Sequence, residues 1–192
     1  MVLVIDSSSA CCGVAVLKPA GQNAESIRPA GRELDLRRQV LELVRPGELS
    51  RIAVAVGPGS FTGVRVGVAY GLGLAIGLGI PIHALPTLEL AALRARVPAT
   101  GLSEAGRGRV YYQAPGAPTG LGEAAEVPRT HPAVGWLRQP TAAALRTAGV
   151  TLLDDAQLRT FAEAAALAFE GAPEVAYGRL RLEYMQSFVS LR

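Results

Sequence analysis

The chain has 192 residues, of which 49% are hydrophobic, and a formal net charge of +3. It can therefore bury a core without metal or disulfide staples, as one large domain or two small lobes. The modest charge, with no basic stripe interleaved with aromatic residues, gives no support to direct, high-affinity nucleic-acid binding. A disulfide between the adjacent Cys11 and Cys12 would be strained, so both are expected as reduced core residues. Because the first residues lack the pattern of a signal peptide, a cytoplasmic location is expected.

Hydrophobic periodicity predicts alternating strands and helices in the first half of the chain. Apolar segments on either side of the turn-like Asp6-Ser7-Ser8-Ser9 predict a hairpin, and residues recurring at helical spacing before Pro46-Gly47 predict an amphipathic helix. The expected elements are strands at 2–5, 13–17 and 24–28, a helix at 32–44, a strand at 52–56, a helix at 61–78, a strand at 80–84 and a helix at 86–96. This order predicts an α/β fold in which helices cover a mixed sheet.

The pattern pauses at residues 97–101 and then starts again, which predicts a domain boundary after residue 97. Asp154 or Asp155 is expected to cap the last long helix and Gly171 to end it. The stretch 114–140 is rich in proline, glycine and alanine and predicts loops with one strand among them. The other elements expected in the second half are strands at 101–104 and 110–112 and helices at 141–147 and 155–170.

A glycine-rich turn, Gly57-Pro58-Gly59-Ser60, joins the strand at 52–56 to the helix at 61–78. A helix N-terminus after such a turn suits an anion. However, the Gly-Lys-Ser/Thr ending of a Walker loop is absent, and the glycine spacing differs from that of a dinucleotide-binding turn. The alternative is a tight strand-to-helix turn with Ser60 as the N-cap.

Small residues form two stripes along the predicted helix at 61–78. Each interior glycine costs a helix roughly 1 kcal/mol relative to alanine, so something is expected to pack close against it. Either stripe could pack on the sheet of this chain, and the presence of two favours contact of the second with another chain. The first stripe comprises Gly63, Gly67, Gly71, Ala75 and Gly79, and the second Ala69, Gly73 and Gly77.

Asp6 ends the first predicted strand and is followed by three serines. A carboxylate and hydroxyls at a hairpin tip can hold a nucleotide phosphate and its metal. From spacing alone, an Asx turn is the favoured interpretation of the same residues.

Residues 66–88 have no acidic or basic residue apart from His83, and this length could cross a bilayer. The glycines of this stretch, with Pro81 and Pro86, break it into a helix, a turn and a short strand. A soluble protein without a membrane span is therefore expected.

Candidate catalytic residues are few. His83 and His131 are the only histidines, no metal-binding spacing of histidine or cysteine is present, and Ser60 does not lie in a Gly-x-Ser-x-Gly elbow. His83, between two apolar strand residues, is more typical of packing than of metal binding.

Four segments together resemble the TsaB family, formerly called glycoprotease-like, of the actin, sugar-kinase and Hsp70 superfamily. The resemblance covers residues 1–112. Glu104 and Gly106 stand where the family usually has Asp and Arg. The segments are Leu3-Val4-Ile5-Asp6-Ser7-Ser8-Ser9, Gly57-Pro58-Gly59-Ser60-Phe61-Thr62-Gly63-Val64-Arg65-Val66-Gly67, Gly77-Leu78-Gly79-Ile80-Pro81 and Glu104-Ala105-Gly106-Arg107-Gly108-Arg109-Val110-Tyr111-Tyr112.

The resemblance implies two actin-like (ribonuclease H-like) lobes, at residues 1–97 and 98–192, with the second lobe short. It also implies a non-catalytic subunit that partners the transferase TsaD in making threonylcarbamoyladenosine next to the anticodon. In that register, the two metal-binding histidines of TsaD fall on Thr87 and Ala91, so no metal site and no catalytic residue are expected here. Arg32-Glu33-Leu34 corresponds to an Arg-Glu-His segment of the family and lacks its histidine.

The implied sites are a partner interface and a degenerate phosphate loop. The implied partners are a TsaD-like paralogue and a TsaE-like ATPase, with a homodimer in isolation and tRNA contacted only through the complex. No cofactor is expected on the chain alone, and ATP or ADP is expected at the interface with those partners. The interface residues are Leu36, Val40, Gly63, Gly67, Val68, Gly71, Leu74 and Ala75, and the loop residues are Asp6, Ser7, Ser8, Ser9, Gly57 and Gly59.

Two other functions remain open from the sequence. An ATP-dependent phosphotransferase would use Asp6 and the glycine turn as its nucleotide site. A serine protease, as the older family name suggests, would depend on Ser60.

Overall fold

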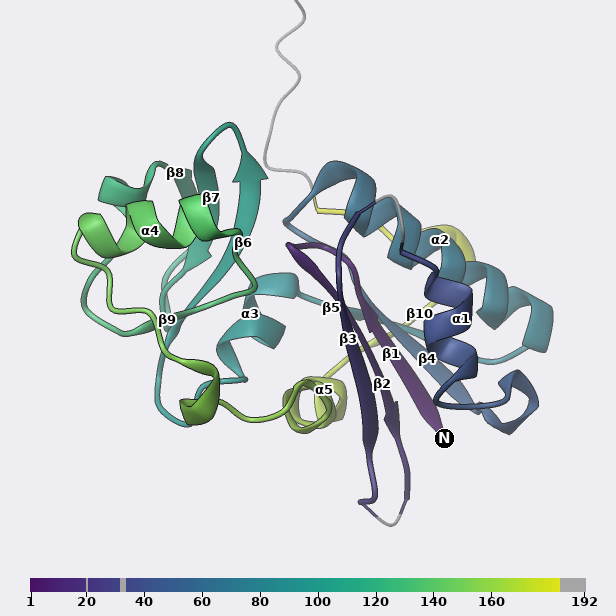
Figure 1. The fold of residues 1–192 in the computed structure, drawn as a ribbon. Helices are drawn as coiled ribbons and strands as arrows, with labels where there is room; N and C mark the ends of the chain where they lie inside the picture. The colour runs from purple at the N-terminus through teal and green to yellow at the C-terminus, as the bar shows by residue number, and fades with distance from the viewer. Residues whose placement is uncertain (20, 32–33, 184–192) are drawn as a thin grey trace, which may run out of the picture.

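The structure is a computed structural model and describes residues 1–19, 21–31 and 34–183. Two mixed β-sheets, each covered by helices, lie side by side (Figure 1). This confirms the predicted mixed α/β fold with a shorter second lobe. The part of the 32–44 helix prediction that falls on residues 32 and 33 lies outside the described residues, as does the tail from residue 184.

The first sheet has six strands in the order β10-β5-β4-β1-β2-β3. β1 lies inside it, antiparallel to β2 and parallel to β4. Every residue of β1 is buried, and its alternate side chains enter two different cores, as expected for a strand covered on both faces. The strands are β1 (Val2–Asp6), β2 (Cys11–Leu17), β3 (Ala24–Pro29), β4 (Arg51–Ala55), β5 (Ile82–Leu85) and β10 (Glu174–Val175).

The second sheet has four strands in the order β8-β7-β6-β9. β6 and β7 form the expected hairpin, and β8 and β9 are two short strands within the stretch predicted as loops with one strand. The strands are β6 (Thr100–Gly106), β7 (Arg109–Gln113), β8 (Gly120–Gly122) and β9 (Ala133–Val134).

Helices cover both faces of the first sheet and the outer side of the second (Figure 1). α1 (Leu36–Leu41) and α2 (Phe61–Leu78) share one core with β1, whereas α5 (Phe161–Glu170) packs in the other core on the opposite face. α3 (Thr87–Ala92) lies between the two sheets, and α4 (Gln139–Thr147) buries Leu145 in the core of the second.

The predicted division after residue 97 stays a prediction. The second sheet begins at Thr100, but α5 and β10 return from the second half of the chain to the first sheet. The C-terminal segment then runs along α2, since the Tyr177 hydroxyl donates to the carbonyls of Ala75 (3.2 Å) and Ile80 (2.8 Å) at the helix end.

Two predicted helices begin later in the structure because of their caps. The Asp35 carboxylate accepts from Arg38 N at 2.9 Å, so α1 starts at Leu36. Asp155 belongs to a 3₁₀ turn, and the capping box of Thr160 and Glu163 starts α5, so the cap predicted at Asp154 or Asp155 is wrong. The Gly171 stop is confirmed, as are both ends of α2, with its Ser60 N-cap and left-handed Gly79.

Among the residues that the structure describes, α2 alone is long and apolar enough to cross a membrane. For a single helix, length and composition are weak evidence of a membrane span. About 28% of its residues are buried inside this chain, and these hold it against the first sheet.

Candidate functional site

The loop after β1 brings the predicted Asp6 and its three serines together in the interior. Asp6 is 4% exposed, and its Oδ1 accepts from the Ser8 amide (2.9 Å) and the Ser8 hydroxyl (2.5 Å), which is the hydrogen-bond pattern of an Asx turn. Burial raises the pKa of the Asp6 carboxyl, although the bonds from Ser8 and the nearby Arg94 act to lower it.

The glycine turn packs directly on this serine loop. Ser60 N donates to Ser8 O at 2.6 Å, and a Cβ added at Gly59 would collide with that same oxygen. Gly57 adopts φ +109°, which favours glycine, and a Cβ there would lie 2.7 Å from Glu183 O. The glycines of the turn therefore allow the contact of two loops of the chain with each other.

Little space remains beside Asp6 for a ligand. The cavity there has a volume of about 10 Å³, enough for roughly one water molecule. Its lining residues come from both lobes, and include Asp6, Thr87, Arg94, Trp136 and Phe161. The predicted phosphate-loop residues thus lie together, but the structure gives no room for a phosphate, and hence no support to a phosphotransferase site.

Thr87 and Ala91, the positions to which the TsaD histidines were aligned, lie one turn apart on α3 and both line this cavity. The Thr87 hydroxyl accepts from Gly57 N at 3.0 Å. Within residues 1–19, 21–31 and 34–183, no group of three or more His, Cys, Asp or Glu residues could hold a metal ion. His83 packs edge-on against Phe169, with ring centroids 4.8 Å apart, and its Nδ1 lies 3.1 Å from Ala172 O.

The glycine stripe predicted as a partner interface faces the sheet of this chain instead. A Cβ at Gly67 would collide with Ser7 Oγ, and one at Gly71 with Val54 Cγ1. Ala75 is fully buried. The interface prediction therefore needs correction for these positions, because a helix this close to its own sheet leaves no surface there for another chain.

Three other residues of that prediction are also part of the core of the first lobe, and Leu74 is half-buried against it. The buried three are Leu36 (6% exposed), Val40 (0%) and Val68 (7%). Gly63 belongs with the buried stripe, since a Cβ there would collide with Ser7 O.

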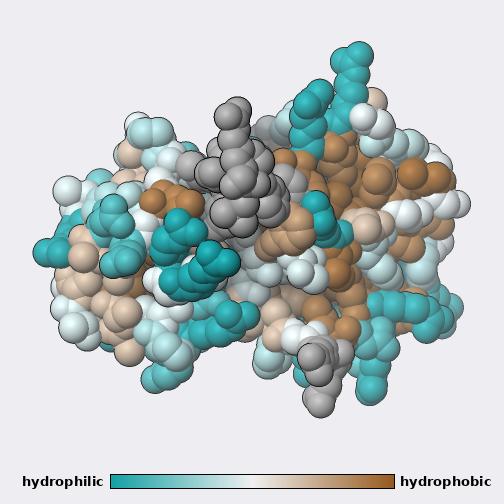
Figure 2. All heavy atoms as spheres, turned by 90° about the horizontal axis from the view of Figure 1, so that it is seen from above, coloured by the Kyte–Doolittle hydropathy of each residue, from teal (hydrophilic) through white to brown (hydrophobic). Residues whose placement is uncertain are grey.

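The outward face of α2 carries the second stripe and several exposed apolar side chains. Nothing lies within 4 Å of a Cβ added at Gly73 or Gly77. Seen from above, this side of the molecule is a broad hydrophobic surface (Figure 2). The exposed large side chains on α2 and the neighbouring α1 are Leu41 (43% exposed), Phe61 (43%), Val66 (44%), Ile76 (55%) and Leu78 (37%).

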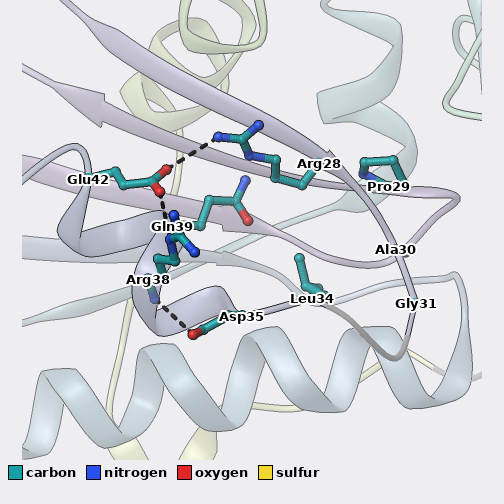
Figure 3. A pocket seen from close by; sticks show the side chains of 9 residues that line it. All are labelled: Arg28, Pro29, Ala30, Gly31, Leu34, Asp35, Arg38, Gln39 and Glu42. Carbon is teal, nitrogen blue, oxygen red and sulfur yellow. Dashed lines mark hydrogen bonds and ion pairs between the residues drawn. The ribbon is translucent and has the colours of Figure 1, made fainter.

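A hollow of about 700 Å³ lies between α1 and the end of β3 (Figure 3). Glu42 pairs there with Arg28 at 3.4 Å and with Arg38 at 3.1 Å, and all three side chains are well exposed, so these ion pairs contribute little stability. Gln39 is 2% exposed and donates both amide hydrogens, to Cys12 O (3.1 Å) and Ser26 O (2.7 Å). Gln39 thus ties α1 to β2 and β3.

Sequence reasoning missed Trp136, Arg94 and the role of Glu104. Glu104 is 6% exposed and accepts from Arg138 N (2.7 Å) and Thr141 Oγ1 (2.8 Å), so it anchors the start of α4. Arg94 lies over the Trp136 ring with its guanidinium 5.0 Å from the ring centroid. Trp136 follows a short strand in a stretch of weak periodicity, where only the presence of a lone tryptophan could have drawn attention to it.

Comparison with known proteins gives relatives in sequence and in fold. The family model for TsaD, tRNA N6-adenosine threonylcarbamoyltransferase, matches residues 38–128. The tRNA threonylcarbamoyladenosine biosynthesis protein TsaB of Bacillus subtilis (strain 168) is 36% identical over 120 residues, covering 57% of this chain and 52% of that protein. The uncharacterized protein ML0378 of Mycobacterium leprae (strain TN) is 37% identical over 65 residues, covering 34% of this chain and 18% of that protein. The matches thus span about half or less of these relatives.

Two solved structures share the fold over almost their whole length. YeaZ from Pseudomonas aeruginosa has a TM-score of 0.75 at 20% identity, over 96% of this chain and 99% of that chain. An uncharacterized protein described as similar to peptidase YEAZ from Pseudomonas aeruginosa has a TM-score of 0.69 at 21% identity, with the same coverage. The sequence matches, together with the order of the serine loop, glycine turn and small-residue helix, show that this chain is similar to the TsaB family over part of its length.

Proposed function

We propose that this chain is a non-catalytic subunit in the biosynthesis of tRNA threonylcarbamoyladenosine, and that it pairs with a TsaD-like paralogue through the outward face of α2. The observation that carries the proposal is this exposed, almost uncharged helix face on a chain whose sequence relative is named a threonylcarbamoyladenosine biosynthesis protein. Large exposed apolar patches on soluble proteins are typical of protein contacts.

The composition of the face favours another helix as its partner. Ala69, Gly73 and Gly77 are spaced four residues apart, so they form one ridge that carries almost no side-chain volume. Val66 and Ile76 stand beside this ridge and would fill the space around an incoming helix. A second backbone can therefore approach α2 closely and bury apolar side chains on either side.

A paralogue fits this face because the TsaD family model matches residues 38–128, which include all of α2. A related chain would bring a helix of similar character to the contact. Arg65 is the one charged residue of α2, and its guanidinium lies 3.7 Å from the centroid of the Phe61 ring at the edge of the face. Charged residues are depleted in the centre of interfaces, as they are on this helix.

The closed cavity beside Asp6 supports an accessory role over a nucleotide-dependent reaction on the chain alone. In this proposal ATP or ADP is held at the joint surface with the TsaD-like paralogue and a TsaE-like ATPase, and tRNA is contacted only through the complex. The assembly works in the cytoplasm.

The proposal is tested with Ile76→Glu, which puts a charge on the α2 face beside Gly73 and Gly77, and with Leu167→Glu as the matched control. Leu167 is also apolar and exposed (42%) but lies on α5, on the opposite face of the sheet. We expect Ile76→Glu to weaken binding to the TsaD-like partner by at least about tenfold, and Leu167→Glu to leave it unchanged.

The same two variants are then expressed in cells that lack the native gene, and threonylcarbamoyladenosine in the tRNA is measured by mass spectrometry. Wild type and Leu167→Glu should restore the modified nucleoside, and Ile76→Glu should not. Full restoration by Ile76→Glu would contradict the proposed interface, whereas failure of wild type would contradict the proposed function. Flotation of the wild-type chain with lipid vesicles would identify a membrane as the surface that α2 contacts.

A further inference from the structure

The loop of residues 7–10 lies where the two lobes meet, between the first turn of α2 and the strands of the second sheet (Figure 1). Its sequence resembles a phosphate loop, but its polar atoms bond to the protein on both sides. This arrangement points to a structural role, the connection of the two lobes, that does not depend on any partner.

On the side of the first lobe, the loop holds the start of α2. Ser7 Oγ donates to Gly63 O at 2.7 Å, and Ser60 N donates to Ser8 O at 2.6 Å. Ser60 N is one of the N–H groups at the helix start that have no acceptor within the helix, so its bond to Ser8 O satisfies it, and the Ser7 hydroxyl adds a second contact to the first turn.

On the side of the second lobe, three bonds reach across from the same loop. Ser9 Oγ and Ala10 N both donate to the carbonyl of Trp136, the latter at 3.3 Å. Ser103 Oγ of β6 donates to Ser8 O at 3.4 Å. Ser8 O thus accepts from Ser60 in one lobe and from Ser103 in the other.

The Trp136 side chain completes the contact by packing into the first lobe. A Cβ added at Gly13 would lie 2.5 Å from the indole, so the ring lies close against the bare backbone of β2. Its centroid is 5.2 Å from that of Phe161, and Arg94 stacks on it. The indole and these neighbours fill the space between the lobes and leave the 10 Å³ cavity beside Asp6.

We propose that the loop of residues 7–10 and Trp136 form a rigid contact between the two lobes, which we call the joint. The joint holds the lobes in one relative orientation and leaves no space for a ligand between them. Gly13 is required because only a residue without a side chain admits the indole. Ser7 and Ser9 act as positioning residues, one fixing α2 and the other fixing Trp136.

The joint is tested in the isolated full chain with Gly13→Ala, and with Gly47→Ala as a control, because nothing lies within 4 Å of a Cβ at Gly47. Trp136 is the only tryptophan, so its fluorescence reports on the joint alone. We expect acrylamide to quench Trp136 at least about twofold more strongly in Gly13→Ala, since the added methyl displaces the indole. Quenching in Gly47→Ala should equal that of wild type.

Ser9→Ala repeats the test without added volume, in case Gly13→Ala does not fold. Loss of one hydrogen bond to Trp136 should raise hydrogen exchange of the backbone around residues 103 and 136 about fivefold, and leave exchange in β4 unchanged. The proposed joint would be contradicted if folded Gly13→Ala showed the same acrylamide quenching as wild type and Ser9→Ala showed the same hydrogen exchange. Neither measurement needs a partner, so the result does not depend on the proposed function.

Discussion

The two faces of α2 are built from the same small residues but meet different surroundings. On the inner face, Gly67 and Gly71 let the helix backbone rest directly on β1 and β4. On the outer face, Gly73 and Gly77 border open space. A stripe of glycine and alanine therefore indicates a close approach of some backbone, and only the space around an added Cβ tells whether that backbone belongs to the same chain.

The largest expected effect comes from filling the inner face. Gly71→Leu would force a side chain into Val54, and the rigid sheet offers no room, so we expect the free energy of unfolding to fall by about 3 kcal/mol or more. Gly73→Leu, two residues along on the outer face, should fold with near wild-type stability. Urea unfolding followed by circular dichroism measures both.

Equal stability of Gly71→Leu and Gly73→Leu would contradict the difference between the two faces, because it would mean that the inner face of α2 can separate from the sheet. Loss of stability in Gly73→Leu alone would mean that the outer face is already covered in the isolated chain. Size-exclusion chromatography of the same samples would then identify a second copy.

The limits of α2 could be predicted from local residues, because Ser60 caps its start and Gly79 ends it in a left-handed conformation. The face that turns inward could not. Both stripes have the same spacing and similar composition, and the choice depends on Ser7, Ile52 and Val54, which come from distant segments. The orientation of a helix with small residues on both faces is set by packing rather than by periodicity.

At the candidate site, too, neighbouring residues in the sequence predicted the local turns, whereas the packing depends on residues from distant segments. Asp6, the serines and the glycine turn could be found by their turn chemistry, and their grouping was implied by the family resemblance. That they leave no room for a phosphate could not be predicted, because Arg94, just after α3, and Trp136 and Phe161, from the second half of the chain, fill the space. The late start of α5 was missed because two capping signals compete, and in the Thr160 box the Thr160 amide also donates to the Glu163 carboxylate.

The pH dependence of stability tests the burial of Asp6, whose loop packs against the start of α2 at the inner face. Burial raises the pKa of the Asp6 carboxyl above 3.8, so the folded chain retains this proton at pH values where the unfolded chain has lost it. The contribution of Asp6 to stability therefore falls as pH rises from below 3.8 through the raised pKa of the folded state. Asp6→Asn keeps an oxygen acceptor for Ser8 but cannot titrate.

We expect the free energy of unfolding of wild type to fall relative to that of Asp6→Asn as pH rises from about 4 toward neutrality. Urea titrations at several pH values measure the difference, with Glu170→Gln at the exposed end of α5 as the control. Parallel pH profiles for wild type and Asp6→Asn would show that water reaches this carboxyl, and that the loop under α2 is open.

The smallest expected effect tests the outer face with a single methyl group. Gly73→Ala should raise the free energy of unfolding by about 0.5–1 kcal/mol, because alanine loses less backbone entropy in a helix and its Cβ meets nothing within 4 Å. Gly77→Ala, in the same open surroundings, should behave alike when both are measured by urea unfolding at two protein concentrations. A stability decrease that grows with protein concentration would mean that another copy already packs on Gly73, since a methyl group there can only interfere with a backbone that the isolated chain does not itself supply.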